Sequence, residues 1–81
     1  MFYTYLLQSE KDSTYYIGYC HDLENRLIEH NRGKTKSIRH KLPMRLIYYE
    51  AYPDKRQSIK RERQLKRNKD EKQKVLERLS W

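Results

Sequence analysis

Three short runs of aromatic and apolar residues along the chain each have the length of a β-strand. Residues 2–8 (FYTYLLQ) and 14–20 (TYYIGYC) are rich in β-forming residues, and a polar cluster at 9–13 separates them. This arrangement predicts an antiparallel hairpin. A third strand is expected over residues 44–52 (MRLIYYEAY).

The first of these runs is apolar on both faces. Tyr3, Tyr5 and Leu7 would lie on one face, and the even-numbered positions from Phe2 to Leu6 are mostly apolar as well. A sheet with two apolar faces needs cover on both. We therefore expect helices on each side.

Polar residues mark the start of a first helix after the hairpin. Asp22 is the expected N-cap, Leu23 and Leu27 supply the apolar stripe, and Gly33 is a suitable C-terminal stop. A basic loop is predicted to follow over residues 34–43.

Two further helices are predicted after the third strand. Asp54 and Gln57 have the spacing of a capping box, and Asn68 and Glu71 repeat it before a short helix over about 70–79. The predicted fold is α+β, a three-stranded antiparallel sheet flanked by helices in the order β-β-α-β-α-α. A chain of 81 residues has room for one domain, which would span 1–81.

The charge balance favours a polyanionic partner. Lys and Arg number 19 against 11 acidic residues, for a formal net charge of +8, so nucleic acid ranks first and an anionic membrane surface second. No apolar run approaches the roughly 18 residues that cross a bilayer, and no signal peptide is visible. Cys20 is the only cysteine and is expected to pack as a small hydrophobe. These features predict a cytoplasmic protein with no membrane partner.

Two polar residues of the first helix lie within or beside its apolar stripe. Arg26 and His30 follow Leu23 by three and seven residues, which places them near Leu27 on the helix surface. They could line a site, or they could simply border the stripe.

A carboxylate on the second helix raises the same question. Viewed along the helix axis, Glu62 lies between Ile59 and Leu65, so it should face the sheet. Because a buried unpaired charge costs several kcal/mol, such a carboxylate needs a cation or a metal. The plainer alternative is a surface pair with Ser58 or Lys66.

Tyr5 and Tyr16 matter for function only if they share a face of the hairpin. Strand pairs whose residue numbers sum to 21 or 23 would place both on one face, and a sum of 22 would separate them. The composition of the turn leaves the register open.

At these residues the sequence resembles the GIY-YIG nuclease superfamily, which includes homing endonucleases, some restriction enzymes and the incision subunit of bacterial excision repair. Tyr3-Thr4-Tyr5 stands at the first motif, and Tyr16-Ile17-Gly18 matches the second. Tyr3 replaces a Gly common in relatives, and Tyr19 replaces a Lys of the repair branch.

The later motifs extend this resemblance over residues 2–69, and it is strongest to the small single-domain branch of the superfamily. Arg26 has the spacing of the family's helix Arg, and His30 follows it by four residues. Glu62 lies in a segment that resembles the one bearing the metal-binding Glu, and Asn68 is a possible counterpart of a late Asn in the homing enzymes.

The resemblance implies hydrolysis of a phosphodiester with one divalent cation. Glu62 would hold Mg²⁺ or Mn²⁺, and Arg26 would clamp the scissile phosphate. Tyr5 would activate water, His30 would take or relay the proton, and Tyr16 would orient the phosphate or the water. A phenol with a pKa of about 10 costs roughly 4 kcal/mol to ionise at pH 7, so Tyr5 needs these neighbours.

Nucleic-acid contacts are expected from exposed cations, with DNA favoured over RNA and low sequence specificity. The candidate residues are Lys34, Lys36, Arg39 and Lys41 in the loop, with Arg63 and Lys66 on the second helix. A protein partner or homodimer could supply targeting. The alternative functions are a non-catalytic nucleic-acid-binding module and a basic adaptor for an acidic protein or anionic membrane.

Overall fold

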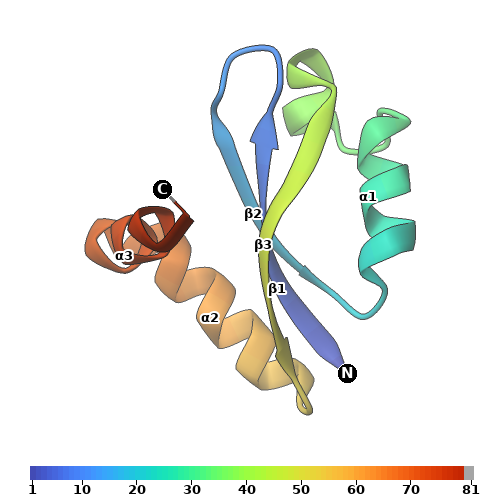
Figure 1. The fold of residues 1–81 in the computed structure, drawn as a ribbon. Helices are drawn as coiled ribbons and strands as arrows, with labels where there is room; N and C mark the ends of the chain where they lie inside the picture. The colour runs from blue at the N-terminus through green and yellow to red at the C-terminus, as the bar shows by residue number, and fades with distance from the viewer. Residues whose placement is uncertain (80–81) are drawn as a thin grey trace.

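The sheet has its first strand in the centre. In the computed structural model, which describes residues 1–79, β1 (Phe2–Ser9) lies between β2 (Tyr15–Cys20) and β3 (Met44–Tyr52) and is antiparallel to both. The element order confirms the predicted α+β fold (Figure 1). The domain predicted over 1–81 includes Ser80 and Trp81, which lie outside the described residues.

The hairpin register places Tyr5 and Tyr16 on one face. Partners across β1 and β2 have residue numbers that sum to 23, so that Tyr5 lies opposite Gly18 and Leu7 opposite Tyr16. Directly paired residues project to the same side of a sheet, and Gly18 and Tyr16 are two residues apart. The shared face that the proposed site requires is therefore confirmed.

Helices cover both faces of the sheet, as its two apolar faces predict. On one face α1 (Leu23–Asn31) and the 3₁₀-helix η1 (Lys36–Lys41) enclose a core that includes Leu7 and Ile38. On the other face α2 (Lys55–Arg67) and α3 (Lys69–Leu79) enclose a core that includes Leu6 and Leu65. Figure 1 shows the sheet between these two layers.

The capping residues are where the sequence placed them. The Asp22 side chain accepts from the Asn25 amide at 3.0 Å, and Gly33 has a φ of 80°, which favours glycine. At α2 the capping box of Asp54 and Gln57 is complete.

Asn68 occupies the junction between α2 and α3. Its side-chain oxygen accepts from the amides of Asp70 and Glu71 at 3.0 and 3.2 Å. The side chain therefore caps α3, and Asn68 is not among the residues that line the cavity described below.

The segment predicted as a basic loop over 34–43 is partly helical. It contains η1, because Ile38 is buried in the core and holds the segment against the sheet. Arg39 also donates from Nε to the carbonyl of Gly33 at 2.7 Å, which closes the turn after α1. The prediction of a loop was therefore wrong for residues 36–41, and the side chains of Lys34 and Lys36 are exposed.

Candidate active site

A cavity of about 490 Å³ lies at the free edge of β2 and brings together residues from both sides of the sheet. Four of the five predicted catalytic residues line it, namely Tyr5, Tyr16, Arg26 and Glu62. The fifth, His30, lies behind Tyr5 and is completely buried.

Gly18 creates the space in which Tyr5 reaches this cavity. The phenol ring of Tyr5 lies over the backbone of Gly18, where an added Cβ would be 2.5 Å from the Tyr5 oxygen. The ring therefore occupies the volume that any larger side chain at position 18 would take. This close approach explains a glycine in the middle of a strand.

Tyr5 is held by a hydrogen-bonded chain that runs into the interior. Its hydroxyl lies 2.8 Å from Nε2 of His30, and Nδ1 of His30 lies 2.7 Å from the hydroxyl of Thr35. The ring of Tyr16 packs edge-on against His30 with centroids 5.1 Å apart. Sequence reasoning identified all of these residues except Thr35, which no motif indicated.

The environment sets the protonation states of Tyr5 and His30. Burial raises the pKa of Tyr5 above its ordinary value, and this effect outweighs the opposing effect of the adjacent Arg26 guanidinium. Burial lowers the pKa of His30, and Arg26 lowers it further. At neutral pH the Tyr5 phenol is therefore protonated and His30 is neutral.

Arg26 supplies a cationic side chain to the lining of the cavity. It interacts with the Tyr5 phenol, which raises the pKa of Arg26, and it forms an ion pair with Glu29 at 3.6 Å. Its side chain is 38% exposed, so a phosphate can reach the guanidinium from the cavity. Planar N–H groups in this position suit a bidentate contact.

Glu62 reaches the cavity from the opposite side of the sheet. The most buried positions of α2 are Ser58 and Leu65, and Glu62 lies on one flank of that buried arc. Its side chain is only 15% exposed and forms an ion pair with Lys66 at 3.6 Å. The predicted orientation toward the sheet is confirmed. The expectation that Ile59 marks the face of α2 that packs on the sheet was wrong. Ile59 is not among the residues packed against either core.

Comparison with known proteins identifies the family of this chain. Residues 1–75 match the model of the GIY-YIG catalytic domain. The chain belongs to the GIY-YIG family. It is 43% identical over 68 residues to a UPF0213 protein of Streptococcus pneumoniae serotype 4, covering 83% of this chain and 68% of that protein. A UPF0213 protein of Streptococcus pyogenes serotype M5 is 40% identical over 74 residues, with coverage of 90% and 79%.

A solved structure gives the same fold. The solution NMR structure of a UPF0213 protein from Bacillus halodurans is 33% identical, with a TM-score of 0.54 and coverage of 94% of this chain and 85% of that one. None of the helices within residues 1–79 combines the length and the apolar character that a membrane crossing requires.

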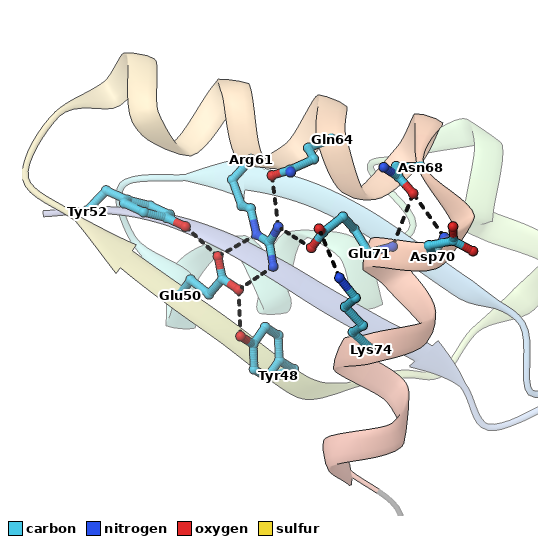
Figure 2. Close-up of polar contacts among 9 residues, drawn as sticks. All are labelled: Tyr48, Glu50, Tyr52, Arg61, Gln64, Asn68, Asp70, Glu71 and Lys74. Carbon is cyan, nitrogen blue, oxygen red and sulfur yellow. Dashed lines mark hydrogen bonds and ion pairs between the residues drawn. The ribbon is translucent and has the colours of Figure 1, made fainter.

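A second polar network fixes the helix that carries Glu62 in this GIY-YIG domain. Arg61 donates from Nε and Nη2 to the carboxylate of Glu50 on β3 at 2.8 and 3.1 Å, and from Nη1 to Glu71 on α3 at 3.2 Å. The hydroxyls of Tyr48 and Tyr52 donate to the same Glu50 carboxylate (Figure 2). Because Arg61 precedes Glu62 directly, this network also fixes the rotation of α2.

The sequence contained one sign of the Arg61 network. Glu50 is the only acidic residue of β3, and tyrosines stand two positions away on either side, on the same face. Burial raises the pKa of Glu50, but the hydrogen bonds from Arg61, Tyr48 and Tyr52 outweigh it and leave the pKa below its ordinary value.

The residues of the cavity suit a hard divalent cation held in part by water. Within residues 1–79 no group of three or more His, Cys, Asp or Glu side chains could enclose a metal. Mg²⁺ is commonly bound through one or two carboxylates, with water and substrate phosphate as the other ligands. A carboxylate such as that of Glu62, which lines the cavity and is 15% exposed, fits that mode.

The predicted nucleic-acid contacts are not among the residues that line the cavity. Lys66 on α2 lies beside it, with Nζ 6.0 Å from the centre of the Tyr16 ring. The exposed residues of the predicted set are Lys34, Lys36, Arg39, Arg63 and Lys66, and Lys41 is half-buried. Lys55 lines the cavity and was not predicted. Cys20 also lines it, and it packs against the core that includes Leu7 and Ile38, as expected of a small hydrophobe.

Proposed function

We propose that the protein is a divalent-metal-dependent endonuclease that hydrolyses phosphodiester bonds in DNA and is directed by structure rather than by sequence. The observation that carries the proposal is the convergence of Tyr5, Tyr16, Arg26 and Glu62 on one cavity in a GIY-YIG domain, with His30 bonded directly behind Tyr5.

The cationic and acidic groups of the cavity have separate tasks. The Arg26 guanidinium binds the scissile phosphate, and Tyr16 orients that phosphate or the attacking water. Glu62 would hold Mg²⁺ or Mn²⁺, which when bound neutralises charge at the phosphate and at the leaving oxygen. Lys66 pairs with Glu62 in the free protein and would be free to contact a neighbouring phosphate.

Water activation by Tyr5 requires a coupled proton transfer. Burial disfavours a preformed tyrosinate, because it raises the pKa of Tyr5. The 2.8 Å contact with Nε2 of His30 offers another route. The Tyr5 oxygen accepts a proton from water while its own proton passes to His30, so that no isolated tyrosinate forms.

The expected substrates follow from the type of contact. Lys and Arg side chains on phosphates position a duplex but carry no direct sequence information. The exposed Lys and Arg side chains therefore support sequence-independent binding, and the structure of the DNA would decide where cleavage occurs.

The experiment is a nuclease screen over duplex, branched, damaged and single-stranded DNA and RNA, with Mg²⁺, Mn²⁺ or chelator. Glu62→Ala should abolish cleavage and preserve or improve binding, because the change removes a negative charge beside the phosphate path. Glu10→Ala removes an exposed carboxylate from the hairpin turn and serves as the matched control. Cleavage retained by Glu62→Ala contradicts the metal role, and binding without cleavage by the wild type supports a binding module.

A further inference from the structure

Thr35 contacts the buried histidine behind the candidate catalytic tyrosine. His30 has no exposed surface, and its two ring nitrogens contact two hydroxyls, those of Tyr5 at 2.8 Å and Thr35 at 2.7 Å. Thr35 comes between Lys34 and Lys36 and immediately precedes η1. The proton relay therefore ends in the segment that carries candidate phosphate contacts.

The contacts of Tyr5 determine which nitrogen of His30 carries the proton. The Arg26 guanidinium lines the same cavity as Tyr5 and carries a positive charge and no acceptor, so the lone pairs of the Tyr5 oxygen are favoured on its side. The proton of the Tyr5 hydroxyl is then directed away from that charge and toward Nε2 of His30, 2.8 Å away. A neutral imidazole has one proton, which must lie on Nδ1 and point to the Thr35 oxygen.

We infer that Thr35 is a positioning residue that holds His30 in the tautomer able to accept the proton of Tyr5. Without the Thr35 oxygen, the N–H at Nδ1 would be a buried donor with no acceptor. The proton would then favour Nε2, and His30 would donate to Tyr5. The Tyr5 proton would point away from His30, and the relay from water would lose its acceptor.

This inference rests on the proposed function for its catalytic consequence, but the tautomer itself does not. ¹⁵N NMR of the histidine ring nitrogens distinguishes the two neutral forms directly. His21 and His40 are exposed and provide internal references in the same spectrum. The wild type should show His30 protonated at Nδ1, and an Nε2-protonated His30 in the wild type would overturn the inference.

Two substitutions test the role of the hydroxyl. Thr35→Val preserves the branched shape and removes the acceptor, so His30 should change to the Nε2-protonated form and kcat should fall by about tenfold or more with little change in KM. Thr35→Ser keeps the hydroxyl and should retain both the tautomer and most of the turnover. Ser37→Ala removes an exposed hydroxyl from the same segment and is the control.

The outcomes separate this inference from the proposed function. A Thr35→Val protein that keeps the Nδ1-protonated His30 refutes the role of Thr35, as does a Thr35→Ser protein that changes tautomer. If Thr35→Val does not fold, Thr35→Ala gives the same readout without placing a methyl group against the ring. If no form of the protein cleaves DNA, the endonuclease proposal fails. The measured tautomer of His30 still shows whether Thr35 sets its protonation.

Discussion

Gly18→Ala tests the packing of the candidate site with the smallest possible addition. The new Cβ would lie 2.5 Å from the Tyr5 oxygen and 2.6 Å from Cζ, whereas ordinary van der Waals contact starts at 3.4 Å. The hydroxyl must therefore move by about 0.9 Å, or the β2 backbone must shift. Tyr5 has little room, because it is 2% exposed and packs against the rings of Tyr16 and His30.

The expected effects on stability and on turnover have different causes. Overpacking of a core typically costs about 1–3 kcal/mol, which for a domain of this size lowers Tm by roughly 5–20 °C. The same displacement stretches the 2.8 Å contact between Tyr5 and His30. A misplacement of about 1 Å at a catalytic group can reduce turnover by roughly 100-fold, and we expect a loss of that order.

The assay measures Tm by circular dichroism and kcat at saturating DNA, at a temperature where the variant is fully folded. Ile17→Val is the matched control, because Ile17 adjoins Gly18 but packs into the core on the opposite face. It should lose about 0.5–1.5 kcal/mol of stability and keep its turnover. A Gly18→Ala protein with the wild-type Tm and kcat would show that the Tyr5 ring does not lie over Gly18.

Three further predictions concern charge. Arg26→Lys should reduce kcat/KM by about tenfold or more with Tm nearly unchanged, because a Lys loses the bidentate geometry, and unchanged kinetics would leave Arg26 without a role at the phosphate. Glu50→Gln should lose about 1–3 kcal/mol at pH 7 by weakening the contacts of Arg61. Since the pKa of Glu50 is lowered by folding, its contribution is present above the unfolded pKa of about 4.3 and is lost as pH falls through the folded value. Tm of the wild type should therefore drop more steeply between about pH 5 and 3 than Tm of Glu50→Gln, and parallel curves would contradict the linkage. For a duplex contacted at about five phosphates, log K should fall with log salt at a slope near −4 to −5, and a slope near zero would assign the basic surface another purpose.

Local interactions made much of this fold predictable from the sequence. The third strand, the cap at Asp22 and the capping box at Asp54 depend on residues a few positions apart, and all three are where the sequence placed them. The apolar character of both sheet faces likewise required helices on each side. The GIY-YIG resemblance supplied the set of candidate residues, and the family comparison confirms that membership.

The tertiary structure decided how these residues meet. The hairpin register is set at the turn, where Ser13 has a φ of 63° and the Ser9 amide donates to the Thr14 carbonyl at 2.8 Å, and turn composition did not specify it. The position of β2 at the free edge lets Glu62 reach a cavity from the other side of the sheet. The partnership of His30 with Thr35 and that of Arg61 with Glu50 also arise only on folding. Sequence periodicity reports which face of its own element a residue occupies, whereas contacts between elements depend on the relative placement of whole strands and helices.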